Sequence, residues 1–295
     1  MQRQVEIPSD GITLSGVLHV PDDLAAGERR PAIVMLHGFG ANKRGGPETI
    51  CTHFEQWGYV ALRFDFRGCG ESGGKRGRVL PLEHVNDVRN AVTAMTQWDE
   101  IDPGRIAVCG SSLGAGVGVY ATAIDQRIAA VITENCLARG ETVIRGMHDE
   151  DSFNGFLHLM HNIQRDLLDR GQVRTIHRFS LYEMPKHLQG NLASNGSLME
   201  FSGETALGYF SFRPVEMVSK ISPRPMLLLH ARGDRLTPFT EAFELVQRAG
   251  SPCELHLIDG ANHFMFVHPD PRILSIMKGW LDLHFPIRAG GPAAP

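Results

Sequence analysis

The chain has 295 residues, 42% of them hydrophobic and 21% charged, and its formal net charge is −4. These values are typical of a globular protein, and they argue against a disordered chain and against a membrane protein. The length suits one α/β domain with an insertion. Because no basic stripe with interleaved aromatic residues occurs, nucleic acid is not an expected partner.

The N-terminus lacks the apolar core of a signal peptide, and no stretch approaches the ~18 apolar residues that span a bilayer. We therefore expect a cytoplasmic protein without a membrane partner. Because no Cys-x-x-Cys pair occurs, we expect reduced thiols and no bound metal. The five cysteines are scattered along the chain, at positions 51, 69, 109, 136 and 253.

Two extended segments open the chain, at residues 4–7 and 12–20, and the Asp-Gly pair between them predicts a β-hairpin. The apolar run at 31–36 is too short for a helix, and it predicts a strand buried on both faces of a parallel sheet. A helix at 48–57 and a strand at 59–66 are predicted next. Helices and strands therefore alternate after the hairpin.

The alternation continues through the middle of the chain. Residues 81–98 have the pattern of an amphipathic helix, and a strand at 105–109, a Gly- and Ala-rich helix at 115–123 and a strand at 129–133 follow. Such alternation indicates a mostly parallel sheet with right-handed crossovers. The apolar stripe predicted for the amphipathic helix consists of Leu82, Val85, Val88, Val92 and Met95.

Residues 137–208 break the alternation, and we interpret them as a cap or lid inserted over the active site after the sixth strand. The core then comprises 1–136 and 209–287, and residues 288–295 are predicted to form a flexible tail. Aromatic residues in and beside the insertion either pack a small core of its own or line a substrate cleft: Phe153, Phe156, Phe179, Tyr182, Phe201, Tyr209, Phe210 and Phe212.

The predicted insertion also contains a His-Asp-Glu-Asp sequence at 148–151, with His158 and His161 nearby. The last two histidines can share one helix face, which would suit a metal. Neither a His-Glu-x-x-His pattern nor a cysteine ligand accompanies them, so we interpret this stretch as a solvated polar face.

A regular pattern returns with a buried strand at 224–231. Thr237 is the predicted N-cap of the next helix, with Pro238 at its first helical position. A strand at 254–258 and a helix at 271–285 complete the predicted core.

A Gly-x-Ser-x-Gly sequence at 110–114 directly follows the strand at 105–109. A serine at the tip of a strand-to-helix turn presents its hydroxyl to substrate, and glycines on either side remove side chains that would collide across the turn. Ser112 is therefore the predicted nucleophile. Its neighbour Ser111 is a rival at the wrong motif position.

A His-Gly-Phe-Gly sequence at 37–40 follows the strand at 31–36. A Gly-rich loop after a buried strand leaves backbone N–H groups that can bind a developing negative charge, as an oxyanion hole must. We predict the backbone N–H groups of Phe39 and Leu113 as the two donors. A tight turn without this role is the alternative.

Asp234 and His263 also follow buried strands, and with Ser112 they have the chain order Ser, Asp, His. Since serine is a poor nucleophile at neutral pH, His263 is expected to accept its proton, and Asp234 to orient the imidazole. Glu134, which follows the sixth strand, is an alternative acid. Other polar residues near these loops are interpreted as structural: His37, His230 and Asp259.

These four loops resemble the motifs of the α/β-hydrolase superfamily, and the resemblance covers nearly the whole chain outside the insertion. It is greatest for the esterase branch that includes dienelactone hydrolases and feruloyl or acetyl esterases, and prolyl-oligopeptidase catalytic domains are also similar. The resemblance implies an eight-stranded, mostly parallel sheet with a cap. The chain departs from lipases in having Phe39 where they have a further glycine, and from dienelactone hydrolases in having Ser112 instead of cysteine.

The sequence thus predicts a cofactor-independent serine hydrolase that cleaves an ester of a small to medium organic molecule through an acyl-enzyme. An amidase or peptidase, a thioesterase and a carbon-carbon bond hydrolase would use the same triad, so these alternatives stay open. A ligand receptor on a hydrolase scaffold is an alternative from another class. The expected partner is a small-molecule substrate, and self-association into a homo-oligomer is left open.

Overall fold

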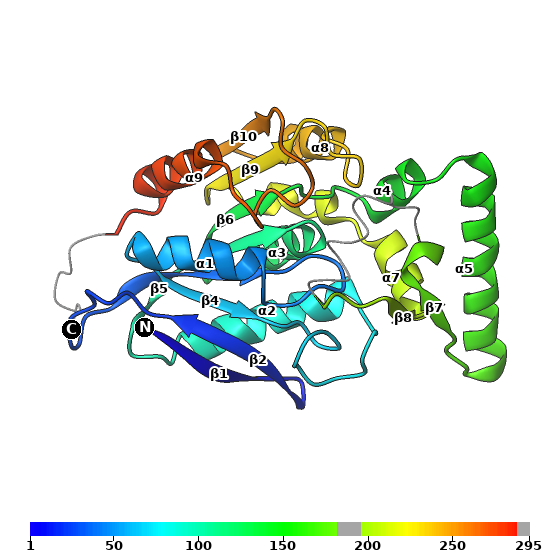
Figure 1. Ribbon diagram of the computed structural model, residues 1–295, viewed down its shortest axis with the longest axis horizontal. Helices are drawn as coiled ribbons and strands as arrows, with labels where there is room; N and C mark the ends of the chain where they lie inside the picture. The colour runs from blue at the N-terminus through cyan, green and yellow to red at the C-terminus, as the bar shows by residue number, and fades with distance from the viewer. Residues whose placement is uncertain (182–195, 288–295) are drawn as a thin grey trace.

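The computed structural model describes residues 1–181 and 196–287, in which strands and helices alternate along the chain (Figure 1). Tyr182 and the predicted tail at 288–295 lie outside these ranges. Within them, no helix combines the length and the apolar character that crossing a membrane requires. The strands of the main sheet are β1 (Gln2–Ser9), β2 (Ile12–His19), β3 (Arg30–Leu36), β4 (Val60–Phe64), β5 (Ile101–Ser111), β6 (Ile128–Glu134), β9 (Met226–Ala231) and β10 (Cys253–Ile258).

The eight strands lie in the order β1-β2-β4-β3-β5-β6-β9-β10. The pairs β1/β2 and β2/β4 are antiparallel, and every other neighbouring pair is parallel. At the predicted hairpin turn, Asp10 and Gly11 have φ values of 46° and 82°, as a type I′ turn requires. The predicted α/β fold class and the hairpin are both confirmed.

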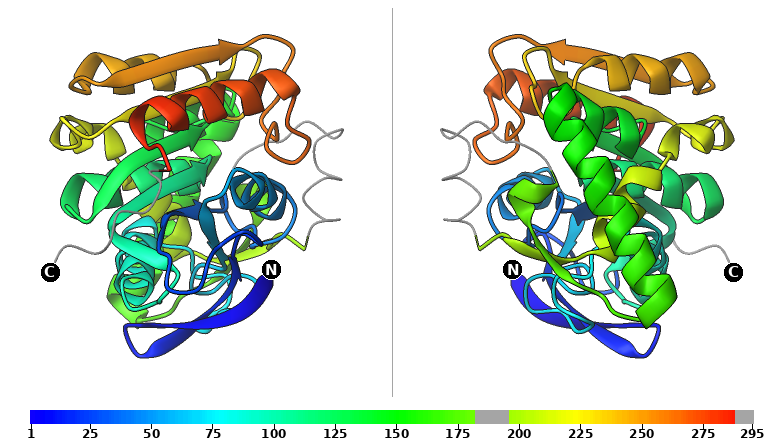
Figure 2. Two further views of the ribbon diagram at one scale, coloured as in Figure 1. Left: turned by 90° about the vertical axis from the view of Figure 1, so that its left-hand side faces the viewer. Right: turned by 90° about the vertical axis from the view of Figure 1, so that its right-hand side faces the viewer.

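Helices cover both faces of the sheet, which is why every residue of β3, β4 and β9 is buried. One hydrophobic cluster joins α1 and α9 to one face, and two others join α2, α3 and α8 to the opposite face (Figure 2). These helices are α1 (Gly46–Gln56), α2 (Pro81–Met95), α3 (Leu113–Ile124), α8 (Thr240–Arg248) and α9 (Pro271–His284).

The apolar stripe predicted for α2 is correct except at its first member. Leu82 is 56% exposed, whereas the other four predicted residues are buried. In its place, His84 and Asp87 are buried on this helix. The carboxylate of Asp87 accepts hydrogen bonds from Ser9 and Arg67, so burial of this charge is compensated.

The predicted N-cap of α8 is wrong. The helix begins at Thr240 rather than at Pro238, and no side chain caps it. Thr237 instead belongs to the preceding turn, where its N–H donates to Asp234 Oδ1 at 3.1 Å and its carbonyl contacts His230 Nε2 at 2.8 Å. These contacts leave the residue outside the helix.

The region between β6 and β9 contains helices and strands of its own, and the predicted boundary between residues 208 and 209 falls inside one of these helices, α7. These elements are α4 (Gly140–Gly146), α5 (Glu150–Arg170), β7 (Thr175–His177), a 3₁₀ turn (Arg178–Ser180), β8 (Glu200–Ser202), α7 (Glu204–Ser211) and two further 3₁₀ turns (Pro214–Glu216 and Val218–Lys220). Strands β7 and β8 pair antiparallel, and α5 lies at the outer edge of the molecule (Figure 1).

The aromatic residues predicted to pack a separate core of the insertion join the main core instead. Phe156, Phe201, Tyr209 and Phe212 belong to the same buried cluster as strand residues such as Val34. Phe153, Phe179 and Phe210 pack against this cluster while partly exposed. The inserted region is therefore continuous with the hydrophobic core.

The turn from β5 to α3 requires its two glycines. Ser112 itself has a φ of 54°, a conformation that side-chain-bearing residues rarely adopt. A Cβ added at Gly110 would lie 2.5 Å from the carbonyl oxygen of Gly114, and one added at Gly114 would lie 2.4 Å from that of His37. Backbone atoms cannot move aside as a flexible side chain can, so both positions are restricted to glycine.

We expect Gly114→Ala to lower the free energy of unfolding by about 3 kcal/mol, because its methyl group overlaps backbone of the neighbouring loop. The matched control is Gly155→Ala in α5, where a Cβ meets no atom within 4 Å. That variant should gain about 0.5–1 kcal/mol from reduced backbone entropy of the unfolded chain. Urea denaturation of both variants measures the difference, and equal effects would contradict the steric argument.

Candidate active site

The structure brings Ser112, Asp234 and His263 together at the carboxyl ends of the parallel strands. Ser112 is at the turn after β5, Asp234 follows β9, and His263 follows β10. His263 Nε2 lies 3.0 Å from Ser112 Oγ, and His263 Nδ1 lies 2.7 Å from Asp234 Oδ2. The other carboxylate oxygen of Asp234 accepts the N–H groups of Leu236 and Thr237. Hydroxyl, imidazole and carboxylate thus form one continuous chain of hydrogen bonds.

Electrostatics favour a charged imidazolium between the serine and the aspartate. Burial opposes charge on His263, but the nearby carboxylate of Asp234 outweighs it and raises the pKa of His263 above its ordinary value. Burial likewise opposes the charge of Asp234, but His263 and the two backbone N–H groups lower the pKa of its carboxyl. The site can therefore hold a proton on the imidazole at low energetic cost.

The loop at 37–40 has one peptide unit whose orientation is set by His37. The ring accepts the N–H of Phe66 at Nε2, 3.1 Å away, so a neutral imidazole carries its proton on Nδ1. Burial lowers the pKa of His37 and keeps it neutral. Its Nδ1–H then donates to the carbonyl of Gly38 at 2.8 Å. Because a trans peptide points its C=O and N–H in opposite directions, the N–H of Phe39 points away from His37.

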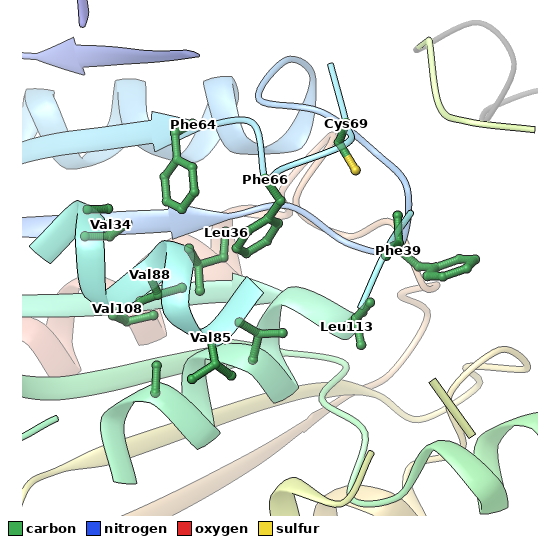
Figure 3. Close-up of a cluster of buried hydrophobic side chains, with 14 of the residues drawn as sticks. Val34, Leu36, Phe39, Phe64, Phe66, Cys69, Val85, Val88, Val108 and Leu113 are labelled. Carbon is green, nitrogen blue, oxygen red and sulfur yellow. The ribbon is translucent and has the colours of Figure 1, made fainter. Parts of the chain in front are cut away.

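The second predicted oxyanion donor is the N–H of Leu113. Leu113 is the first residue of α3, and N–H groups in a first turn have no carbonyl four residues earlier within the helix. The positive end of the helix dipole also favours a negative charge at this position. Figure 3 shows the side chains of Phe39 and Leu113 together at the edge of the buried cluster, so both backbones are anchored by packing.

Two residues at the end of β6, Glu134 and Asn135, hold the loops that carry Ser112 and His263, and the sequence did not predict this role for either. Glu134 is buried; its Oε1 accepts the N–H of Phe266, 2.8 Å away in the histidine loop, and its backbone carbonyl accepts the N–H of Ser112. Burial raises the pKa of Glu134 to about 7, although a hydrogen bond from Ser111 opposes this shift. The alternative in which Glu134 replaces Asp234 beside the imidazole does not match these contacts.

Asn135 connects the aspartate strand to the histidine loop. Its Nδ2 donates to the carbonyl of His263 at 3.1 Å, and its Oδ1 accepts the N–H of Ala231 at 2.8 Å. Its φ of 48° lies in the left-handed region, which asparagine tolerates better than most residues. An Asn directly after a buried strand was the only signal in the sequence.

The remaining candidates lie outside the hydrogen-bonded chain. His230 is buried and contacts the carbonyl of Thr237, and Asp259 pairs with Arg232 at the surface. In the inserted region, His148 contacts the carbonyl of Leu181. Nowhere in residues 1–181 and 196–287 do three His, Cys, Asp or Glu side chains group to hold a metal ion.

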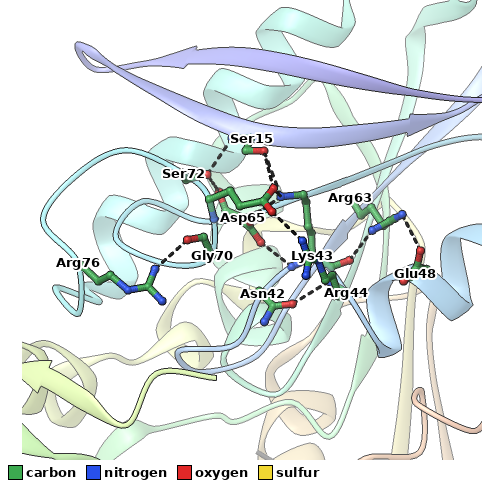
Figure 4. Close-up of polar contacts among 11 residues, drawn as sticks. Ser15, Asn42, Lys43, Arg44, Glu48, Arg63, Asp65, Gly70, Ser72 and Arg76 are labelled. Carbon is green, nitrogen blue, oxygen red and sulfur yellow. Dashed lines mark hydrogen bonds and ion pairs between the residues drawn. The ribbon is translucent and has the colours of Figure 1, made fainter. Parts of the chain in front are cut away.

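A buried ion pair supports one wall of the cleft beside Ser112. Lys43 Nζ lies 2.7 Å from Asp65 and 2.6 Å from Glu71, and Asp65 also accepts the backbone N–H of Lys43 (Figure 4). This network anchors the segment that follows the oxyanion loop. Its neighbours Asn42 and Arg44 line the cleft.

The cleft is lined mainly by apolar side chains. Among the aromatic residues predicted in or beside the insertion and described by the structure, only Tyr209 lines the cleft. The polar lining includes Ser112 and His263, and also Arg44 and Arg178. The apolar lining residues are Met35, Phe39, Ala41, Pro47, Met147, Tyr209, Leu236, Phe264, Phe266 and Val267.

Comparison with known proteins places these motifs in a family. The sequence model of the family described as serine aminopeptidase, S33, matches residues 27–270. The acyltransferase drtE of Aspergillus calidoustus is 23% identical over 95% of this chain and 93% of its own length.

Solved structures give the same fold. The α/β hydrolase GrgF from Penicillium superposes with a TM-score of 0.81 at 23% identity, covering 96% of this chain and 99% of its own. Est1E of Butyrivibrio proteoclasticus, solved with ferulic acid bound, superposes with a TM-score of 0.72 at 18% identity, covering 95% and 98%.

We expect Glu134→Gln to move the acidic limb of the kcat/KM profile to lower pH. Glu134 is negatively charged above its pKa of about 7, and this charge helps to raise the pKa of His263, so a neutral amide lets the imidazole lose its proton at lower pH. The amide oxygen can still accept the N–H of Phe266. The measurement is hydrolysis of an activated aryl ester between pH 5 and about 9, a range that spans ordinary imidazole titration.

The matched control for this pH experiment is Asp259→Asn, which removes a carboxylate that is 73% exposed and paired at the surface. Its profile should coincide with that of the unmodified protein. A Glu134→Gln profile that stays in place, or that moves to higher pH, would contradict the electrostatic argument.

Proposed function

Because the chain belongs to the serine aminopeptidase S33 family of α/β-hydrolases, we propose that it is a serine hydrolase that cleaves carboxylic esters. The observation that carries the proposal is the hydrogen-bonded chain from Ser112 through His263 to Asp234. Its donor and acceptor atoms are arranged as nucleophilic catalysis by a serine requires.

In the proposed mechanism, Ser112 Oγ attacks the carbonyl carbon of the ester while His263 Nε2 takes the hydroxyl proton. The negative oxygen of the tetrahedral intermediate is bound by the N–H groups of Phe39 and Leu113. His263 then returns the proton to the leaving alcohol, and an acyl-enzyme remains. Water, deprotonated by the same imidazole, releases the acid, while Asp234 stabilises the imidazolium in both steps.

The lining of the cleft supports an apolar substrate. Side chains of Leu236, Met147 and Phe264 replace water around the reacting centre, and burial of apolar surface contributes about 25 cal/mol per Å². We therefore propose small to medium esters with an apolar acyl or alcohol part. Because the family is described as serine aminopeptidase, an amide substrate is the first alternative.

Acyl transfer is a second candidate, because the acyltransferase drtE matches 95% of the chain. Acyl transfer by this protein would use the same acyl-enzyme, with an alcohol in place of water as the acceptor. The two activities differ only in which molecule reaches the carbonyl after the first alcohol has left.

Removing the nucleophile or the base should abolish hydrolysis without unfolding the protein. We expect Ser112→Ala and His263→Ala each to lower kcat by about 10⁶-fold, and Asp234→Asn by about 10⁴-fold. A fluorophosphonate should add its mass to the unmodified protein and not to Ser112→Ala. An unlabelled serine in a protein that still binds ligands tightly would favour a receptor instead.

Ester substrates are expected to react faster than matched amides, because resonance makes an amide carbonyl less electrophilic and an amide nitrogen must be protonated before it can leave. The measurement compares kcat/KM for an aryl ester and for the anilide of the same acid. Faster anilide cleavage would replace the esterase assignment with an amidase.

A second experiment distinguishes hydrolysis from acyl transfer: a primary alcohol is added to the reaction, and the products are separated by chromatography.

A further inference from the structure

The backbone of the predicted oxyanion loop is held by a side chain of the inserted region. Arg178 lies in the 3₁₀ turn after β7, and only 1% of its surface is exposed. Its Nη2 donates to the carbonyl of Phe39 at 3.0 Å, and its Nε donates to the carbonyl of Leu198 at 2.8 Å. One guanidinium therefore connects the loop at 37–40 to the segment before β8.

Aromatic packing reinforces this connection. The guanidinium carbon of Arg178 lies 5.1 Å from the ring centres of both Phe39 and Phe201, within the range of cation–π attraction. The two rings stack on each other with centroids 4.5 Å apart. The charge of Arg178 is thus held against the side chain of the residue whose N–H is the predicted oxyanion donor.

The inserted region also approaches the next residue of the loop too closely for any side chain there. A Cβ on Gly40 would lie 2.6 Å from the Phe201 ring and 2.8 Å from Arg178 Nη2. The carbonyl of Gly40 accepts the N–H of Leu198 at 2.7 Å. Two consecutive carbonyls of the oxyanion loop, those of Phe39 and Gly40, are therefore bound by groups from outside the core strands.

Arg178 is itself held in place by the small sheet. Its backbone N–H donates to the carbonyl of Met199, directly after the last pair of the β7/β8 ladder, His177 with Glu200. Ser202, at the end of β8, donates its N–H to the carbonyl of Gly77 in the core. The arginine is consequently positioned relative to the core and is not carried on a free arm.

We propose that Arg178 is a positioning residue for the oxyanion hole. The proposal rests on the serine hydrolase function proposed above. His37 holds the peptide unit that contains the Phe39 N–H, through the Gly38 carbonyl, and Arg178 holds the next peptide unit, through the Phe39 carbonyl. Without Arg178, the loop loses the donor to its Phe39 carbonyl, and the N–H can turn away from the developing charge. An error of about 1 Å in such a group can cost 100-fold in rate.

The test compares Arg178→Met, which keeps an unbranched apolar stem but removes the guanidinium, with the unmodified protein in aryl ester hydrolysis. We expect kcat to fall by about 10- to 100-fold while KM stays within about twofold, because the hole binds the transition state and not the ground state. An aryl boronic acid, which forms a tetrahedral adduct with the serine, should lose affinity by the same factor as kcat.

The matched control is Arg174→Ala. Arg174 lies in the same inserted region and pairs with Asp166, away from the oxyanion loop. The Arg174→Ala substitution removes one positive charge and one ion pair. An effect of the insertion's charge or of its general stability would therefore appear in Arg174→Ala as well as in Arg178→Met. We expect its kcat and boronic acid affinity to equal those of the unmodified protein.

The outcomes separate this inference from the proposed function. If the unmodified protein neither hydrolyses esters nor reacts with a fluorophosphonate, the proposed function fails. If it does both, a kcat for Arg178→Met within threefold of the unmodified value, or a loss equal to that of Arg174→Ala, overturns the role of Arg178. A rise in KM with unchanged kcat also overturns it, since that would show substrate binding instead.

If Arg178→Met does not fold, Arg178→Lys tests the same proposal. Lysine keeps the charge but has one donor atom, so it cannot bind both the Phe39 and Leu198 carbonyls in the fixed geometry of a guanidinium. A kcat at least tenfold lower with unchanged KM supports the proposal. Unmodified kcat in this variant overturns it.

Discussion

The backbone conformation of Ser112 is the constraint on which the site depends. A positive φ at a serine costs about 1–3 kcal/mol and persists only where the surroundings impose it. Here the central strand β5 ends and α3 begins with a single residue between them, while the backbones of Gly110, Gly114 and His37 lie too close together for side chains. The same close approach places the serine hydroxyl, the first N–H groups of α3 and the oxyanion loop beside one another. The strain is offset by the large buried sheet on which the turn is built.

Around this turn, polar contacts between loops determine the positions of the site residues. The parallel strands bring their carboxyl ends to one edge, but they do not set the distance from His263 to Ser112. Glu134 and Asn135 do so, because one binds the histidine loop at Phe266 and the other binds it at the carbonyl of His263. The imidazole consequently lies near two carboxyl groups. Asp234 contacts Nδ1 directly, and Glu134 acts through its charge and through the loop.

The inserted region is part of the same structure. Phe201 and Tyr209 belong to the main hydrophobic cluster, so the region is packed against the core as well as joined to it by Arg178. An insertion that only covered a cleft could vary without effect on chemistry. In this protein Arg178, in the turn at Arg178–Ser180, donates to the Phe39 carbonyl, so a change in this turn would remove a contact with the loop at 37–40.

Local patterns in the sequence determined the alternation of strands and helices, the hairpin at Asp10-Gly11, the family resemblance and the choice of Ser112, Asp234 and His263, because each depends on residues close together in the chain. They were wrong where two local structures compete for one residue: Thr237 resembled a helix cap, yet its backbone N–H completes the turn at Asp234. The roles of Glu134, Asn135 and Arg178 were decided by tertiary structure alone. Glu134 binds Phe266, Asn135 binds Ala231 and Arg178 binds Phe39 across 132, 96 and 139 residues of chain, and no pattern of spacing or hydropathy records such contacts.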